Sequence, residues 1–247
     1  MTSRVIPTEL ATALRNAERV VVLTGAGVSA ESGVPTFRDA QTGLWARYRA
    51  EDLATPEAFR RDPSLVWGWY RWRRELVAGA EPNPGHHAIV ELADRVPELT
   101  LVTQNVDSLH QRAGSRGVIE LHGNIMRTVC ADCRQEREDP GEGEGDPSRC
   151  SCGGLLRPDV VWFGEMLPAD ALEQAGRAAR ACDLFLCVGT SSLVYPAAAL
   201  PYEALTGGAD VAEVNPAETP LSGRVRWTLR GPSGEVVPAL VRAAWPE

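Results

Sequence analysis

Lysine is missing from this sequence, in which all 25 basic residues are arginine and 33 residues are aspartate or glutamate. The formal net charge is −8, so no overall positive field attracts the chain to nucleic acid or to an anionic membrane surface. The sequence also lacks an apolar run of the roughly 18 residues that a membrane span needs. Its start, MTSRVIPTEL, has no basic segment followed by an apolar one. We therefore expect a cytoplasmic protein without a nucleic-acid or membrane partner.

Strand and helix patterns alternate along most of the 247 residues, of which 44% are hydrophobic. Apolar, β-branched runs predict strands at 19–25, 99–104, 117–123, 158–164, 183–190 and 209–215. Helical patterns lie at 8–17, 84–95, 168–181 and 196–206. This α/β alternation predicts a parallel Rossmann-like sheet with helices on both faces and with ligands bound at the carboxyl ends of the strands.

Two segments interrupt the alternation. Residues 40–80 are rich in tryptophan and predicted to be helical, and residues 124–157 carry a cluster of cysteines. We expect both insertions to form a small zinc-binding and helical lobe within a single domain that spans residues 1–247. The large Rossmann-like lobe would then consist of residues 8–39, 81–123 and 158–247.

The cysteines fall into two groups. Cys182 and Cys187 lie in an apolar run, where cysteine usually behaves as a small buried hydrophobe. The other four lie within 23 residues that are rich in glycine, aspartate, glutamate and arginine; they are Cys130, Cys133, Cys150 and Cys152. In a chain without an export signal, this clustering favours metal over disulfides. Four thiolates suffice for one closed, structural zinc site, with reduced thiols without metal as the alternative. The second pair is C-x-C, one residue shorter than the usual C-x2-C, which predicts a strained or weaker site.

A glycine-rich loop, beginning Gly25-Ala26-Gly27, follows the first predicted strand. Such glycines let the backbone approach a pyrophosphate, and the N–H groups that open the next helix complement the anion. The pattern alone also fits a tight turn that binds no ligand, and the acidic ribose ligand of hydride-transferring folds does not follow. The loop instead continues as GAGVSAESGVPTFRD (25–39), which resembles the signature of the sirtuins, the NAD-dependent protein deacylases.

Two more motifs, TQNVDSLHQRAG (103–114) and ELHGN (120–124), resemble the catalytic core of the same family. His122 ends a predicted strand beside a glycine, and the ordinary histidine pKa near 6.5 suits proton abstraction at neutral pH. The resemblance implies that the acyl-lysine oxygen attacks the ribose carbon that bears nicotinamide, after which His122 deprotonates a ribose hydroxyl. The products would be nicotinamide, 2'-O-acyl-ADP-ribose and free lysine.

The resemblance assigns roles to the positions that match its motifs. Catalysis would use His122, Asn105 and Asp107, and Phe37 would shield an oxocarbenium-like centre from water. The implied contacts of the co-substrate NAD are Gly25, Ala26, Gly27, Ser29, Phe37, Arg38, Trp45, Gln104, Asn105, Val106, Asp107, Gly189, Thr190, Ser191, Asn215 and Ser233. The implied contacts of the acylated lysine, which is the expected protein partner, are Ala54, Tyr70, Arg73, Val161, Trp162, Phe163 and Gly164, of which 161–164 would pair with the substrate backbone.

The helical segment 64–76 bears on the acyl group. Tyr70 and Arg73 are three residues apart and project from the same helix face. An amphipathic helix with a packed tyrosine and a solvated arginine is the ordinary interpretation. However, Tyr-x2-Arg after LATPEAF resembles class III sirtuins, whose pocket accepts negatively charged acyl groups, and Ala54 matches the small residue that leaves room there. We therefore expect desuccinylation and demalonylation to be favoured over deacetylation.

Two other kinds of function remain open at this stage. The same cleavage of NAD can end in ADP-ribosylation of a protein or in hydrolysis of NAD, and neither reaction needs an acyl pocket. A non-catalytic sensor of NAD or ADP-ribose would need the glycine-rich loop but no histidine base.

Overall fold

The computed structural model describes residues 6–35, 48–138 and 147–246. Its larger sheet has six strands in the order β3-β2-β1-β7-β8-β9, and every neighbouring pair is parallel. The strands are β1 (Arg19–Thr24), β2 (Glu98–Thr103), β3 (Ile119–Glu120), β7 (Leu184–Val188), β8 (Asp210–Val214) and β9 (Trp227–Leu229). The predicted parallel α/β sheet is thereby confirmed.

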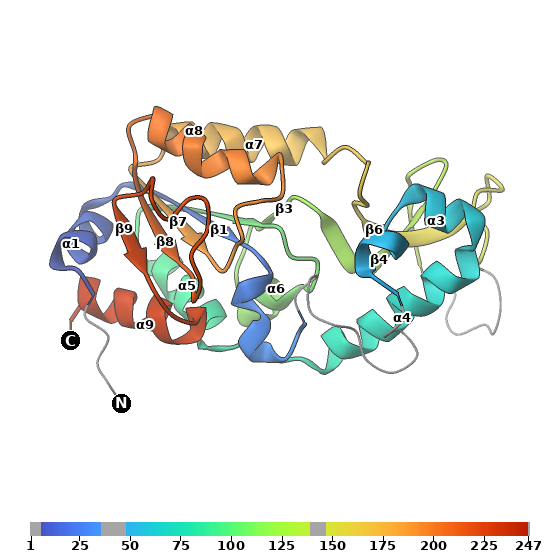
Figure 1. Cartoon of the computed structure of the whole chain (residues 1–247), viewed down its shortest axis with the longest axis horizontal. Coiled ribbons are helices and arrows are strands. Elements are labelled where there is room, and N and C mark those ends of the chain that lie inside the picture. Colours follow the sequence, from blue (N-terminus) through green and yellow to red (C-terminus); the bar gives the residue numbers. More distant parts are fainter. Residues whose placement is uncertain (1–5, 36–47, 139–146, 247) are drawn as a thin grey trace.

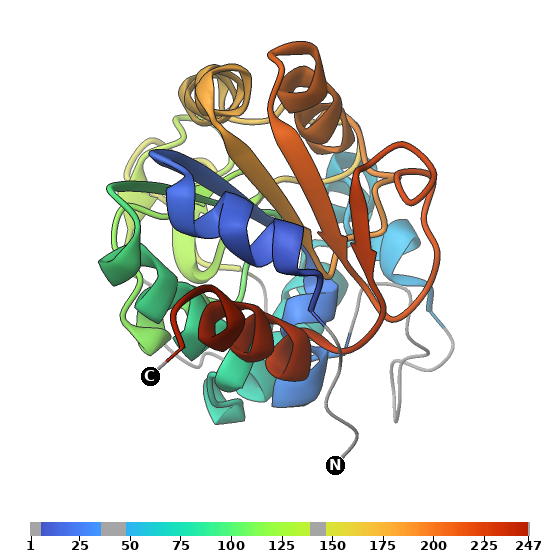
Figure 2. The same ribbon diagram turned by 90° about the vertical axis from the view of Figure 1, so that its left-hand side faces the viewer.

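Helices cover both faces of this sheet (Figure 2). One face carries α1 (Thr8–Asn16), α5 (Pro84–Arg95) and α9 (Ser233–Ala244), and the other carries α7 (Ala169–Ala181) and α8 (Leu200–Thr206). Successive side chains of a strand point to opposite faces. Accordingly Val20 and Val22 pack into the core under α1, α5 and α9, whereas Val21 and Leu23 pack into the core under α7 and α8.

A second, smaller lobe lies beside the large sheet (Figure 1). Its three-stranded antiparallel sheet consists of β4 (Gly123–Cys130), β5 (Glu136–Arg137) and β6 (Leu156–Val160). Its helices are α2 (Ala50–Leu53), α3 (Pro56–Arg61) and α4 (Pro63–Gly79). The indole nitrogen of Trp67 on α4 donates to the Leu156 carbonyl oxygen at 2.6 Å, which ties this helix to β6.

The sequence-based prediction for 158–164 was wrong about its sheet and its length. The strand begins at Leu156, ends at Val160 and pairs with β4 of the small sheet, and Trp162–Gly164 lie in or next to a turn. An apolar run indicates that a strand is buried, but it does not specify which other strand it pairs with. Pairing is decided by contacts between segments that are distant in the sequence.

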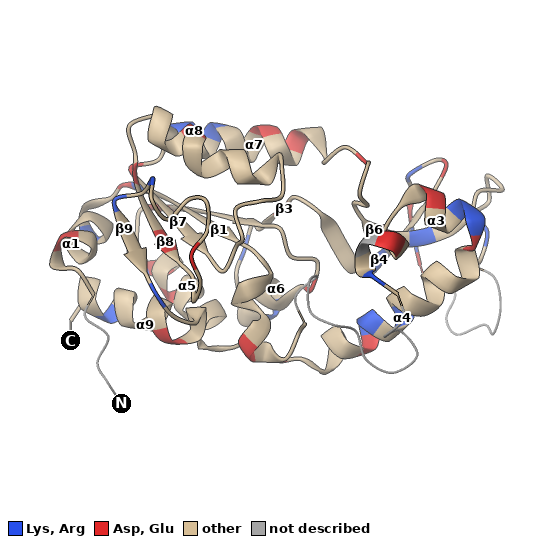
Figure 3. Ribbon diagram, viewed as in Figure 1, with Lys and Arg blue, Asp and Glu red and all other residues tan. Residues whose placement is uncertain are grey.

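Acidic and basic residues occur together on the surface helices α3, α4 and α7 (Figure 3). Two pairs one helical turn apart illustrate this, Arg60 with Glu57 and Arg177 with Glu173. Within residues 6–35, 48–138 and 147–246, no helix combines the length and the apolar character that a membrane crossing requires.

The loops that follow β1 and β7 pack directly against each other through glycine. The Gly27 N–H donates to the Gly189 carbonyl oxygen at 2.8 Å, and a Cβ added at Gly27 would lie 2.7 Å from that oxygen. We expect Gly27→Ala to lower the free energy of unfolding by about 1–3 kcal/mol, because the clash is with backbone that cannot move aside. Urea denaturation followed by tryptophan fluorescence measures this loss.

Gly79→Ala is the matched control, since nothing lies within 4 Å of a Cβ added at this helical position. This change should leave stability unchanged or raise it by up to about 1 kcal/mol, because alanine favours helix. Equal losses in the two variants would contradict the packing argument.

Candidate active site

His122 lies at the point where the chain passes from the large sheet to the small one. The preceding strand, β3, runs parallel to β2, and the Leu121 N–H donates to the Thr103 carbonyl oxygen at 2.9 Å. The next residue, Gly123, begins β4, and the His122 carbonyl oxygen accepts a hydrogen bond from the Val161 N–H at 2.9 Å. The backbone around His122 is therefore anchored to both lobes.

The His122 ring is held in one tautomer. Its Nδ1 lies 2.8 Å from the Gln104 carbonyl oxygen, and because a carbonyl can only accept, Nδ1 carries the proton. The neutral ring then has its lone pair on Nε2. Burial lowers the pKa of His122 below its usual value, although the bond to Gln104 opposes that shift. The side chain is therefore poised to accept a proton at neutral pH.

Position 123, directly after His122, must be glycine for a steric reason. Gly123 has φ +77°, in the left-handed region, and a Cβ at this position would overlap the Asp159 carbonyl oxygen on β6. Only glycine allows this close approach of β4 to β6 immediately beyond the histidine.

Ser29, Asn105 and Asp107 form a buried polar cluster beside this point. The Ser29 hydroxyl donates to Asp107 Oδ2 at 2.7 Å and accepts from Asn105 Nδ2 at 3.0 Å. Burial raises the pKa of Asp107, and its hydrogen bonds oppose that rise. The structure thus brings together three of the predicted site residues, which come from two segments separated by some 75 positions.

Two histidines that the sequence analysis missed lie next to the cluster. His86 Nε2 lies 3.4 Å from the Ser29 hydroxyl, and His110 Nε2 lies 2.9 Å from the Thr24 hydroxyl. The two rings are 4.8 Å apart, and burial lowers the pKa of His86 to about 4 and of His110 to about 3. Both are therefore neutral at physiological pH. The feature of the sequence that could have revealed them is a histidine on the apolar face of a helical pattern.

Residues at the carboxyl ends of four strands meet around Thr190. The Gln104 side chain donates to the Thr190 hydroxyl at 2.9 Å, and the Asn215 side chain donates to the Thr190 carbonyl oxygen at 2.8 Å. Gly25 and Gly27 approach the same loop so closely that a side chain on either would meet Gly189 or Thr190. Loop packing therefore already accounts for both glycines. The helix expected after them is two short 3₁₀ turns, Ala26–Val28 and Ala30–Ser32.

Ser233 begins α9 beside the glycine-rich loop. Glu31, in the second 3₁₀ turn of that loop, accepts from the Gly234 N–H at 2.6 Å and from the Ser233 hydroxyl at 3.3 Å. A carboxylate at a helix N-terminus satisfies N–H groups that the helix itself leaves unpaired. Glu31 thereby joins the loop after β1 to the start of the last helix.

Glu213 is a buried carboxylate that the sequence analysis did not single out. It is 1% exposed on β8, accepts from the Ser222 and Thr219 hydroxyls, and pairs with Arg230 at 3.2 Å. These contacts hold the loop that begins at Asn215. A charged residue within the apolar pattern VAEVN was the signal that could have revealed it.

The residues expected around the acyl group lie in the small lobe. Tyr70 is 1% exposed, and its hydroxyl accepts a hydrogen bond from the Trp162 indole nitrogen at 2.8 Å. Arg73 is partly buried, with its guanidinium carbon 5.2 Å from the centre of the Trp69 ring. Burial lowers the pKa of Arg73, whereas the Asp107 carboxylate acts in the opposite direction.

The segment 161–164 links these residues to the histidine. Ala54 is 3% exposed, and its carbonyl oxygen accepts from the Phe163 N–H at 2.9 Å. Two residues earlier, Val161 is bonded to the His122 carbonyl oxygen. Phe163 is 46% exposed and Gly164 has φ +87°. The predictions for Phe37, Arg38 and Trp45 lie outside the described residues, and the assigned roles of the other residues remain predictions.

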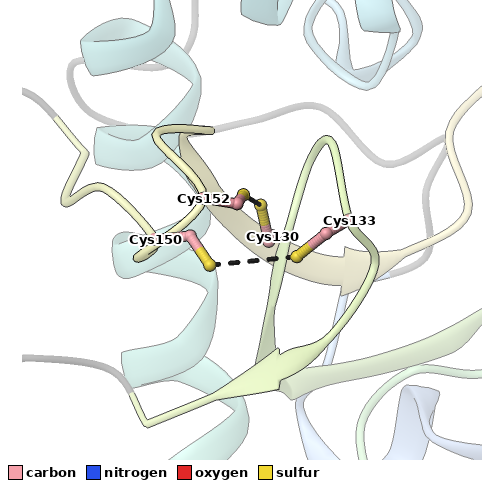
Figure 4. A group of neighbouring side chains, drawn as sticks. All are labelled: Cys130, Cys133, Cys150 and Cys152. Carbon is pink, nitrogen blue, oxygen red and sulfur yellow. Dashed lines mark hydrogen bonds between the residues drawn. The ribbon is translucent and has the colours of Figure 1, made fainter.

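The four clustered cysteines converge in the small lobe (Figure 4). All four sulfur atoms lie within 4.8 Å of one another, with 3.4 Å between Cys130 and Cys152 and 3.8 Å between Cys133 and Cys150. A tetrahedral zinc with Zn–S bonds of about 2.3 Å separates its sulfur atoms by about 3.8 Å. The donor set therefore fits one structural zinc ion.

The short C-x-C pair reaches the site through a tight turn. The Gly153 N–H donates to the Cys150 carbonyl oxygen and the Cys150 N–H to the Gly154 carbonyl oxygen, both at 2.8 Å, while Gly153 has φ +94°. This turn brings Cys150 and Cys152 to the same side. The turn thus gathers all four thiols although the second cysteine pair has one intervening residue rather than two.

A parallel Rossmann-like domain with a buried polar cluster at its strand ends, joined to a four-cysteine module, defines a nucleotide-binding α/β protein with a zinc lobe. The Sir2 family model matches residues 25–196. The chain belongs to the Sir2 family, and the resemblance to the sirtuins is confirmed.

Individual relatives agree with this assignment. The chain is 54% identical over 244 residues to an NAD-dependent protein deacylase of Methylococcus capsulatus, covering 95% of this chain and 96% of that one. It is 54% identical over 242 residues to NAD-dependent protein deacylase 1 of Pseudomonas aeruginosa, covering 94% and 97%.

Solved structures agree as well. The crystal structure of a Sir2 homologue in complex with NAD is similar with a TM-score of 0.90 and 46% identity, covering 99% of this chain and 96% of that one. A Sir2 protein bound to an acetylated peptide is similar with a TM-score of 0.86 and 30% identity, covering 96% and 98%.

We predict that the purified chain contains one zinc ion and that Cys133→Ser loses it, because three thiolates no longer close the tetrahedron. Metal content by mass spectrometry and thermal unfolding measure the effect. The variant should unfold at a lower temperature, since binding of the metal and folding of such a module are coupled. Cys182→Ser, a change at a cysteine outside the cluster, is the control and should keep its zinc. Full zinc content in Cys133→Ser would contradict the assignment.

Proposed function

We propose that this protein is an NAD-dependent protein-lysine deacylase that converts an acylated lysine and NAD into free lysine, nicotinamide and 2'-O-acyl-ADP-ribose. The observation that carries the proposal is the His122 ring. Its Nδ1 proton is committed to the Gln104 carbonyl oxygen, which leaves Nε2 as a base at the carboxyl edge of the sheet. The names of the relatives as NAD-dependent protein deacylases support the general activity.

NAD would lie along the carboxyl ends of the parallel strands, where α/β folds bind such ligands. The residues around Thr190, including Gln104 and Asn215, offer hydroxyl and amide groups for its phosphates and adenosine ribose. The Ser29, Asn105 and Asp107 cluster would face the nicotinamide half. The similar structure solved in complex with NAD supports NAD as the ligand.

In the reaction, the acyl oxygen attacks the ribose carbon while the bond from that carbon to nicotinamide breaks. The new C–O bond gives an O-alkyl imidate. His122 Nε2 then takes the proton of a ribose hydroxyl, whose oxygen adds to the imidate carbon. Addition of water and loss of the lysine amine complete the reaction. Because Nδ1 stays bonded to Gln104, the resulting imidazolium keeps its charge-assisted hydrogen bond.

The pH dependence of the rate reports on this base. Because burial lowers the pKa of His122 below its usual value of 6.5, we expect the acid limb of the kcat/KM profile to have its midpoint below pH 6.5. His122→Ala should reduce kcat by about 10²- to 10⁴-fold, the usual contribution of a general base. The rate of product formation, measured by mass spectrometry across pH 5 to 8, checks both the pH profile and the effect of His122→Ala. An acid limb centred above pH 6.5, or a His122→Ala enzyme as active as wild type, would contradict the assignment.

We further propose that the acyl pocket favours succinyl and malonyl groups over acetyl. Tyr70 on α4 is bonded to Trp162, and Ala54 is bonded to Phe163, so both contact the segment that leads back to His122. Arg73 lies three residues after Tyr70 on the same helix. A guanidinium can hold a carboxylate through two charge-assisted hydrogen bonds worth about 1.5–3 kcal/mol each. The partly buried position of Arg73 strengthens such an interaction, because less water competes for it.

Arg73→Met should reduce kcat/KM for a succinylated peptide by about 10²-fold, while the value for the acetylated form of the same peptide changes by less than about threefold. Arg71→Met is the matched control, since Arg71 lies two residues away and points to a different face of α4. This control should keep the preference for the succinylated peptide. An unchanged preference in Arg73→Met would overturn the pocket assignment but leave the deacylase proposal standing.

A further inference from the structure

The strand that delivers His122 is short. β3 has two residues at the edge of the large sheet and pairs with β2 at Ile119 and Glu120. A two-residue ladder does little to fix the direction of the chain that follows it. Other contacts must therefore position His122, two residues further on.

The Glu120 side chain supplies such contacts. It is 13% exposed, and its Oε1 accepts from Gln111 Nε2 and from Asn124 Nδ2, both at 2.7 Å. Its Oε2 pairs with the Arg127 guanidinium at 2.7 Å. Gln111 belongs to α6 (Leu109–Ala113), and Asn124 and Arg127 belong to β4, so one carboxylate joins the residues before and after His122 to a neighbouring helix.

Arg127 extends this connection to the third strand of the small sheet. Its Nε donates to Asp159 Oδ2 at 2.9 Å, and Asp159 lies two residues before Val161, which is bonded to the His122 carbonyl oxygen. The guanidinium therefore links Glu120, on the large-sheet side of His122, to Asp159, on the substrate-segment side. Arg74 Nη2 on α4 also donates to the Arg127 carbonyl oxygen at 2.8 Å, which anchors the backbone of Arg127.

We propose that Glu120, through Arg127, is the positioning residue for the His122 base. This inference rests on the proposed function, because it assigns to the ion pair the placement of Nε2 against the ribose hydroxyl. Glu120 does not touch the reacting atoms. It acts by fixing the two peptide segments between which His122 is held, and a misplacement of about 1 Å at a reacting group can cost 10²-fold in rate.

The reaction offers a readout that separates positioning from general structure. Nicotinamide leaves before His122 acts, so exchange of labelled nicotinamide into NAD, in the presence of acylated peptide, measures the first step alone. Deacylation measures both steps. A misplaced base should slow deacylation and leave the exchange intact, whereas a disturbed fold should slow both.

The test compares Glu120→Gln with wild type on one succinylated peptide. We expect kcat for deacylation to fall by about 10- to 100-fold, with KM for peptide and for NAD, and the rate of nicotinamide exchange, within about twofold of wild type. Arg127→Met should lower kcat by about 10-fold or more with the same intact exchange. Arg127→Lys should recover part of that loss, because it keeps a positive charge beside Glu120.

Glu173→Gln and Arg177→Met are the matched controls, since they remove the two partners of an exposed ion pair on α7 and should leave kcat unchanged. An unaltered kcat in Glu120→Gln, or equal losses of exchange and deacylation in Glu120→Gln and Arg127→Met, overturns the positioning role. If Glu120→Gln does not fold, the two Arg127 variants decide by the same criteria. A wild-type enzyme that exchanges nicotinamide but forms no O-acyl-ADP-ribose overturns the proposed function and this inference together.

Discussion

The hydrogen bond from His122 Nδ1 to the Gln104 carbonyl oxygen joins the chain that follows β3 to the end of β2. It fixes the tautomer of the ring, and it requires that two separate segments leave the large sheet side by side. Gly123 turns the chain into the small sheet at a place where β6 is too close for any side chain. The chemistry of the imidazole therefore depends on the geometry of the crossing between the two lobes.

Buried polar groups surround this crossing on the side of the large lobe. Ser29, Asn105 and Asp107 bond to one another, and the neutral His86 lies beside them. A buried polar group without a partner is costly, so such a cluster persists only when nearly all its members are paired. Further along the sheet, the buried Glu213 holds a loop and the exposed Glu31 binds the start of α9, each through several hydrogen bonds. Together they form a rigid polar edge suited to a polar ligand.

Much of the fold and site could be predicted from local patterns. Alternating strands and helices gave the parallel sheet, and the spacing of four cysteines gave the metal cluster. The strand at 158–164 was placed in the wrong sheet, because an apolar run carries no information about its partner. His86 and Glu213 were missed for a related reason, since each is a polar residue within an apolar pattern and its partners come from elsewhere in the chain.

By itself the sequence determined most of the elements, the family and the identity of the chemical groups, because hydrophobic period, glycine-rich turns and cysteine spacing are local properties. Only the tertiary structure decided which groups meet. It committed Nδ1 of His122 to a carbonyl 18 positions away, placed Glu120 between Gln111 and Arg127, and closed the short cysteine pair onto a distant one. These contacts join segments that are distant in the sequence, and which segments meet is decided by the packing of the whole chain.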